Sequence, residues 1–90
     1  SLLHREKTHH VRIYSVAVHP DFRNKKFGQM LIGRAAGYAR TNHARKITLE
    51  VNVSNVAAIG LYEKNGFVKA RIIPSYYHDG ADAYYMQCNL

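Results

Sequence analysis

The segment YSVAVHPDFRNKKFGQMLI, residues 14–32, decides the fold because the period of its hydrophobic residues changes partway along it. β-branched and aromatic residues dominate up to Pro20 and extend back to Val11, which predicts a strand over residues 11–18. From Phe27 apolar residues recur every three or four positions, which predicts a helix that ends near residue 41. A short basic turn joins the two elements.

Three cations, Arg23, Lys25 and Lys26, lie in this turn, and Gly28 follows them. The first backbone N–H groups of a helix have no internal partner, and the helix dipole adds positive charge there, so an anion can bind. Gly28 allows a close approach because it lacks a Cβ. The turn alone leaves two interpretations open, a site for a phosphate-bearing ligand and a solvated basic turn.

Further elements follow the first helix. Strands are expected over residues 45–53, 67–73 and 81–90, with a second helix over 56–65, whereas residues 1–10 are expected to be irregular or the frayed end of a strand. Ser54 and Asn55 are N-cap types just before the second helix, and Gly66 is placed as its C′ residue. A helical connection makes the first two strands parallel, and a loop makes the last two antiparallel. The expected fold is an α/β domain with a mixed sheet in the order β-α-β-α-β-β.

Length and composition set limits on this domain. Ninety residues allow one domain, residues 1–90, and no apolar run approaches the length that spans a bilayer, so no membrane partner is expected. The single cysteine, Cys88, excludes an internal disulfide and indicates a reducing, cytoplasmic location. Six histidines lack ligand spacing, so no metal site is expected. The net charge of +7 suits nucleic acid, an acidic surface or a polyphosphate ligand.

The opening segment, together with LEVNVSNVAAIGLYEKNGF and the tail YYHDGADAYYM, resembles the acetyl-CoA-binding half of the GNAT superfamily of N-acetyltransferases. The tail is most similar to the protein N-terminal acetyltransferases, namely the bacterial ribosomal-protein alanine acetyltransferases and their archaeal and eukaryotic relatives. The resemblance covers residues 11–90 and implies a partial GNAT fold, whose N-terminal strands and helix pair precede this chain. A partner chain, a second copy or a preceding segment is therefore expected to complete the sheet.

The same resemblance implies acetyl-CoA as the co-substrate. The superfamily has a loop of the form Q/R-x-x-G-x-G/A, which here reads RNKKFG, and its strand and helix residues also contact the cofactor. The residues expected to bind acetyl-CoA are Val16, Ala17, Val18, Arg23, Asn24, Lys25, Lys26, Phe27, Gly28, Gln29 and Asn55. Lys26 replaces a family glycine, which strains the backbone by roughly 1 kcal/mol if φ is positive and has no penalty if φ is helical. We favour the helical alternative.

The resemblance also implies the catalytic residues. Glu50 matches the general base and Tyr62 the general acid, whereas the residues alone equally allow a strand carboxylate that holds a nearby cation and a core tyrosine. Tyr76 and Tyr77 match a pair that lines the acceptor groove, with loop packing as the alternative. An N-terminal α-amine has a pKa of about 7.7–8.0, so a modest base suffices to deprotonate it.

Three functions are consistent with the sequence. The leading one is an acetyl-CoA-dependent acetyltransferase that acts on the N-terminus of a protein or peptide, and the positive charge suits work near the ribosome. The second is a cofactor- or partner-binding fragment without turnover. The third is a nucleic-acid-binding module, which is disfavoured because no helix is dense in lysine and arginine.

Overall fold

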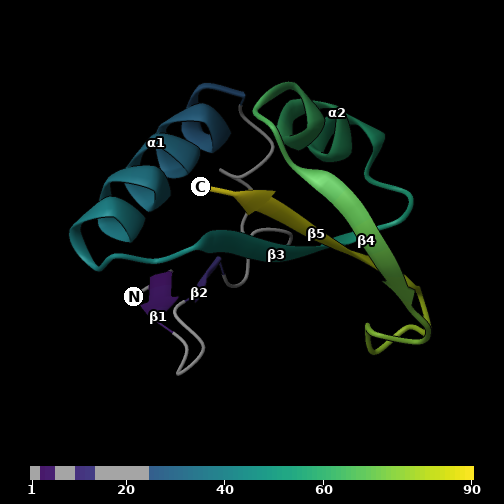
Figure 1. The fold of residues 1–90 in the computed structure, drawn as a ribbon. Coiled ribbons are helices and arrows are strands. Elements are labelled where there is room, and N and C mark those ends of the chain that lie inside the picture. Colours follow the sequence, from purple (N-terminus) through teal and green to yellow (C-terminus); the bar gives the residue numbers. More distant parts are fainter. Residues whose placement is uncertain (1–2, 6–9, 14–24) are drawn as a thin grey trace.

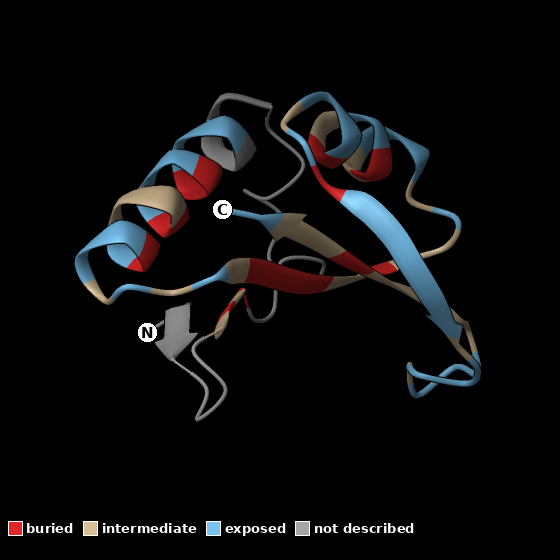
Figure 2. Ribbon diagram, viewed as in Figure 1, coloured by how far each residue is buried: buried red, intermediate tan, exposed pale blue. Residues whose placement is uncertain are grey.

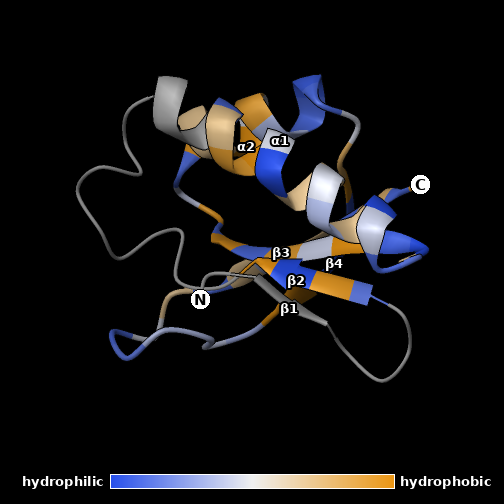
Figure 3. Ribbon diagram, turned by 90° about the vertical axis from the view of Figure 1, so that its left-hand side faces the viewer, coloured by the Kyte–Doolittle hydropathy of each residue, from blue (hydrophilic) through white to orange (hydrophobic). Residues whose placement is uncertain are grey.

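Five strands form one mixed sheet, and two helices lie over one of its faces (Figure 1). The computed structural model describes residues 3–5, 10–13 and 25–90. The elements are β1 (Leu3–Arg5), β2 (His10–Ile13), α1 (Lys25–Thr41), β3 (Lys46–Asn52), α2 (Val56–Lys64), β4 (Val68–Ile73) and β5 (Ala83–Asn89). A view turned by 90° shows the same two layers, with α1 and α2 on one side of the sheet (Figure 3). The predicted mixed α/β fold is confirmed.

The strand order is β1-β2-β3-β5-β4. β2 and β3 are parallel, from His10↔Lys46 to Ile13↔Leu49, and β4 and β5 are antiparallel, both as expected. The antiparallel pairings of β1 with β2 and of β3 with β5 were not predicted. The structure adds β1, which lies in the segment expected to be irregular or frayed and pairs with β2. The first predicted strand is described only as β2, and its remaining residues, 14–18, lie outside the described part of the chain.

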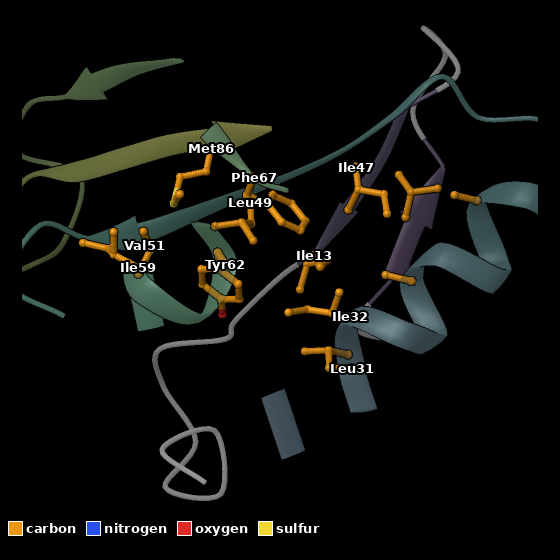
Figure 4. Close-up of a cluster of buried hydrophobic side chains, with 13 residues drawn as sticks. Ile13, Leu31, Ile32, Ile47, Leu49, Val51, Ile59, Tyr62, Phe67 and Met86 are labelled. Atoms are coloured by element: carbon orange, nitrogen blue, oxygen red, sulfur yellow. The ribbon is translucent and has the colours of Figure 1, made fainter. Parts of the chain in front are cut away.

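Alternation along β3 separates the two faces of the sheet. Ile47, Leu49 and Val51 are buried under the helices, and their close-up shows them facing the side chains of α1 and α2 (Figure 4). Thr48 and Glu50 therefore point to the opposite face. Burial follows the same division, with buried positions along β3 and on the inner sides of the helices, whereas β4 is exposed along most of its length (Figure 2).

The buried stripe of α1 differs from the predicted one. Leu31, Ala35 and Ala39, spaced four residues apart, are buried against the sheet. Met30 and Tyr38, which the periodicity also placed on the stripe, are 45% and 37% exposed. A four-residue spacing lies closer to one line of a helix than the three-residue steps that reach Met30 and Tyr38, so the latter lie at its margin.

Both ends of α2 have the expected caps. The side chain of Asn55 accepts a hydrogen bond from the N–H of Ala58 at 3.2 Å, which identifies it as the N-cap. Gly66 follows the helix with φ of 94°, a conformation that favours glycine at C′. The N–H of Phe67 then donates to the carbonyl of Tyr62 at 3.0 Å, so the chain turns back onto the core at Phe67.

The described residues hold neither a membrane-spanning helix nor a group of metal ligands. No helix within residues 3–5, 10–13 and 25–90 is both long and apolar enough to cross a bilayer. Across the same ranges, no three histidine, cysteine, aspartate or glutamate side chains group in a way that would hold a metal ion. Cys88 is a free thiol that packs at the edge of the core.

Candidate functional site

A bidentate ion pair lies on the sheet face opposite the helices, near the carboxyl ends of β2 and β3. Arg12 Nη2 lies 2.6 Å from Glu50 Oε1, and Arg12 Nε donates to Glu50 Oε2 at 3.3 Å. The side chain of Glu50 is 8% exposed and that of Arg12 is 29% exposed. Sheet register explains the meeting, because Arg12 is opposite Thr48 and Glu50 is the next residue of β3 on the same face.

The predicted acceptor tyrosines lie in the loop between β4 and β5 and reach the same ion pair. Arg12 Nη2 also donates to Tyr76 Oη at 3.4 Å. Tyr76 and Tyr77 meet edge to face, with ring centroids 5.0 Å apart and planes at 86°. Burial, then Tyr76 and Glu50, raise the pKa of Tyr77, which indicates that Tyr77 lies within the field of the carboxylate.

Two aspartates organise the tyrosine loop, residues 74–82 between β4 and β5. The carboxylate of Asp82 accepts a hydrogen bond from the N–H of Ser75 at 2.9 Å, and Ser75 has a positive φ of 51°. Asp79 accepts from the N–H of Ala81 at 2.9 Å, and Gly80 provides a further positive φ. Aspartate and glycine are the residues expected in such a turn, so the local sequence itself fixes where the tyrosines lie.

Tyr62 lies on the other side of the sheet, on α2. It is 2% exposed, and its ring packs against Phe67 with centroids 5.7 Å apart. Figure 4 shows its hydroxyl oxygen at the margin of the hydrophobic cluster. Burial, followed by the nearby Tyr77, raises the pKa of Tyr62 to about 12. The phenol therefore stays protonated at neutral pH and can donate a hydrogen bond.

Glu50 and Tyr62 lie on opposite sides of the sheet, and each of them interacts electrostatically with Tyr77. The structure leaves both interpretations of each residue open, because Glu50 does hold a cation and the ring of Tyr62 does lie in the core.

Arg12 is the residue that the sequence analysis did not single out. The available signal was an arginine at the polar position of a strand, between Val11 and Ile13, both of which are buried. Its partner could not be named from the sequence, since Glu50 lies 38 residues further along the chain. Only the parallel register of β2 and β3 brings the two side chains together.

The predicted cofactor residues are described only in part. Val16, Ala17, Val18, Arg23 and Asn24 lie outside the described residues, whereas Lys25, Lys26, Phe27 and Gly28 form the first turn of α1. Lys26, which stands where the family has a glycine, therefore has a helical backbone and carries no left-handed strain.

Two further predicted cofactor residues, Gln29 and Asn55, have clear contacts within the protein. Gln29 Nε2 donates to Asn65 Oδ1 at 3.1 Å, and Asn65 Nδ2 donates to Gln29 Oε1 at 3.2 Å. The side chain of Asn55 is half-buried and caps α2. These contacts give both residues a structural role, and a cofactor contact for either remains a prediction.

Comparison with known families gives a match over most of the chain. The model of the acetyltransferase (GNAT) family matches residues 1–67. An N-alpha-acetyltransferase from Saccharolobus solfataricus is 40% identical over 75 residues, which cover 82% of this chain and 45% of the relative.

Solved structures agree in sequence and fold. The ribosomal-protein-S18-alanine N-acetyltransferase from Escherichia coli has a TM-score of 0.73 at 33% identity, over 90% of this chain and 54% of that one. A putative streptothricin acetyltransferase from Bacillus anthracis, solved in complex with acetyl coenzyme A, has a TM-score of 0.78 at 27% identity, over 98% of this chain and 53% of that one. The chain thus spans about half the length of the relatives it matches.

Proposed function

Because the chain belongs to the acetyltransferase (GNAT) family, we propose that it binds acetyl-CoA and transfers the acetyl group to the N-terminal α-amine of a protein. One observation carries the proposal beyond family membership. Glu50, Arg12 and the tyrosine loop meet on one face of the sheet, and Tyr77 in that loop interacts electrostatically with both Glu50 and Tyr62. A carboxylate and a phenol that share this neighbour suit an amine and a thioester that react between them.

The amino-terminal turn of α1 supports the choice of donor. The first backbone N–H groups of a helix have no partner within it, and together with the dipole of this 17-residue helix they favour an anion such as a diphosphate. A family member of similar fold has been solved with acetyl-CoA bound, which makes this thioester the simplest donor. The predicted contacts with Arg23, Asn24 and Lys25–Gly28 remain part of the proposal.

The proposed reaction is direct transfer without an enzyme-bound acetyl group. Glu50, directly or through a water, accepts a proton from the α-amine, and the amine nitrogen forms a bond to the thioester carbonyl carbon. The resulting tetrahedral oxyanion collapses with cleavage of the carbon–sulfur bond. The products are the N-acetylated acceptor and the thiolate of coenzyme A, which takes a proton from solvent while Glu50 releases to solvent the proton that it accepted.

The raised pKa of Tyr62 defines what its hydroxyl can contribute. Full proton transfer from a phenol of pKa about 12 to a thiolate of pKa about 8.5 is uphill by roughly 5 kcal/mol. A hydrogen bond to the departing sulfur requires no such transfer, and it stabilises the negative charge as the charge develops. We therefore assign Tyr62 the role of hydrogen-bond donor to the thiolate, with final protonation from solvent.

The acceptor class follows from the same chemistry. Roughly a tenth of an α-amine with a pKa near 8 is neutral at pH 7, against well under a thousandth of a lysine side chain. Tyr76 is 41% exposed and close to Arg12, so its ring and hydroxyl suit contact with the first residues of a peptide. A ribosomal protein is one candidate acceptor, since a relative at 33% identity carries that name.

The half-length match supports a second candidate, a cofactor-binding unit without turnover. The chain covers only 45% to 54% of the relatives reported above, and the remainder could supply the other wall of the acceptor groove. In that case acetyl-CoA binds but no acetylated peptide forms, unless a second copy, a partner chain or a longer protein completes the groove.

Two experiments distinguish these possibilities. Calorimetry with acetyl-CoA should show binding near micromolar levels, and its absence would contradict both candidates. An assay of peptide N-termini with acetyl-CoA then compares wild type with Glu50→Gln and Tyr62→Phe. We expect each substitution to lower kcat by about 10²-fold, within the usual range for such groups, while acetyl-CoA binding is unchanged. Wild-type rates in both variants would refute the catalytic assignments.

A further inference from the structure

We propose that Arg12 is a positioning residue for Glu50, an assignment that rests on the proposed function. Its guanidinium orients the carboxylate that accepts the amine proton and joins that carboxylate to the tyrosine loop that receives the acceptor. Arg12 itself exchanges no proton or bond with the reactants. Arg12 acts through the two groups that it contacts.

The geometry of the pair favours orientation over simple charge neutralisation. Two different nitrogens of Arg12 face two different oxygens of Glu50, Nη2 to Oε1 at 2.6 Å and Nε to Oε2 at 3.3 Å. Two contacts of this kind fix the plane of the carboxylate as well as its position. A lysine ammonium can balance the charge, but it is a single point and lacks the rigid fork.

The burial of the Glu50 side chain makes a charged partner necessary. The side chain of Glu50 is 8% exposed and is flanked along β3 by Leu49 and Val51, both fully buried on the other face. A carboxylate that is largely removed from water is unfavourable without a partner, and without Arg12 it would rotate toward solvent. Its direct cross-strand neighbour in β5, Tyr85, already has the guanidinium of Arg71 over its ring at 5.1 Å.

The contact with Tyr76 extends the role of Arg12 to the acceptor. The same nitrogen, Nη2, donates to Tyr76 Oη at 3.4 Å, so one guanidinium sets the distance between Glu50 and the tyrosine loop. The pair of Arg12 and Glu50 has no net charge, so it does not hold an acceptor in its unreactive ammonium form. A misplacement of about 1 Å in such an arrangement can lower the rate about 10²-fold.

The test measures steady-state peptide acetylation in wild type, Arg12→Met and Arg12→Lys. We expect Arg12→Met to lower kcat by about 10- to 100-fold while KM for acetyl-CoA changes by less than about twofold. Arg12→Lys should recover only part of the loss, because it restores charge without the fork. Arg71→Met, which removes the same charge from β4, is the matched control and should retain wild-type rates.

A background without the base separates positioning from a general structural effect. If Arg12 orients Glu50, then adding Arg12→Met to Glu50→Gln should lower kcat at saturating peptide by less than about twofold further, and the lost contact with Tyr76 should appear in KM for the peptide instead. A full multiplicative loss in the double variant would overturn the proposal. An equal loss in Arg71→Met would also overturn it, because charge alone would then explain the effect.

An NMR measurement decides the pairing independently of turnover. The Nε–Hε resonance of Arg12 should shift on Glu50→Gln, and the ring resonances of Tyr76 should shift on Arg12→Lys. If neither signal responds, Arg12 does not position these groups and the proposal fails. If the signals respond but no peptide is acetylated by wild type, the proposed function fails while the Arg12 contact stands.

Discussion

The side-chain amides of Gln29 and Asn65 exchange two hydrogen bonds, at 3.1 and 3.2 Å, across the contact between α1 and α2. Asn65 Nδ2 also donates to the carbonyl of Leu61, one turn earlier on its own helix, at 2.8 Å. Gln29 follows directly after the turn proposed to bind the diphosphate, and Asn65 ends the helix that carries Tyr62. This amide pair therefore connects the two parts of the proposed acetyl-CoA site.

Removal of this amide pair tests its contribution to stability. We expect Asn65→Ala to lower the free energy of unfolding by about 1 kcal/mol, because three exposed or half-buried hydrogen bonds are lost. A double-mutant cycle with Gln29→Ala, measured by urea denaturation, should give a coupling energy of about 0.5–1 kcal/mol. Asn42→Ala is the control, since the side chain of Asn42 donates to Tyr38 of its own helix, and its cycle with Gln29→Ala should be additive.

Gly66 and Gly33 give opposite predictions for the same substitution. Gly66→Ala should lower the free energy of unfolding by about 1 kcal/mol, because φ is 94° and an L residue is strained there. Steric contact is not the cause, since an added Cβ would lie 3.5 Å from Cys88 Sγ. Gly33 lies on the exposed face of α1, and an added Cβ would have no heavy atom within 4 Å beyond its own helix backbone. Gly33→Ala should therefore raise the free energy of unfolding by up to about 1 kcal/mol. Equal shifts in the urea midpoints would contradict this explanation.

Local signals in the sequence were sufficient for most of the fold. The change of period near Phe27, the N-cap at Asn55 and the glycine at Gly66 are each set by nearby residues, and the structure has all three features close to where they were predicted. α1 begins at Lys25, two residues before the predicted start, and helix ends are the part of a helix that periodicity defines least well.

Features that depend on pairing between distant residues could not be predicted in the same way. β1 has three residues and no periodicity of its own, so its strand conformation depends on pairing with β2. The Arg12–Glu50 contact depends on the β2–β3 register in the same manner. The roles of Glu50 and Tyr62 came from family resemblance, because a carboxylate on a strand and a tyrosine on a helix have no specific signature by themselves.

The tyrosine loop offers a test of Asp82. Its carboxylate accepts a hydrogen bond from the N–H of Ser75, whose φ of 51° is unusual for a residue with a side chain. We expect Asp82→Ala to lower the free energy of unfolding by about 1 kcal/mol and to accelerate amide exchange at Ser75 by about tenfold. Asp79→Ala is the matched control, because Asp79 accepts from the N–H of Ala81 rather than from that of Ser75, and exchange at Ser75 should be unchanged. Slow exchange at Ser75 in Asp82→Ala would show that the loop does not depend on this carboxylate.

The raised pKa of Tyr62 predicts how stability depends on alkaline pH. The folded protein holds the phenol proton up to a pKa of about 12, whereas the unfolded chain loses it near the ordinary value of 10.0. Below the unfolded pKa both states are protonated and the contribution of Tyr62 is fully present. As pH rises between the two values, the unfolded state ionises first, so stability falls by about 1.4 kcal/mol per pH unit.

Tyr62→Phe removes this titration and keeps the ring that packs against Phe67. Urea denaturation of both proteins at about pH 9 and about pH 11 gives the difference in their free energies of unfolding. We expect wild type to lose about 1.3 kcal/mol relative to the variant over this interval, because other groups titrate equally in both proteins. A difference that stays constant with pH would show that the Tyr62 hydroxyl is well solvated, and it would remove the reason for treating it as a hydrogen-bond donor that stays protonated.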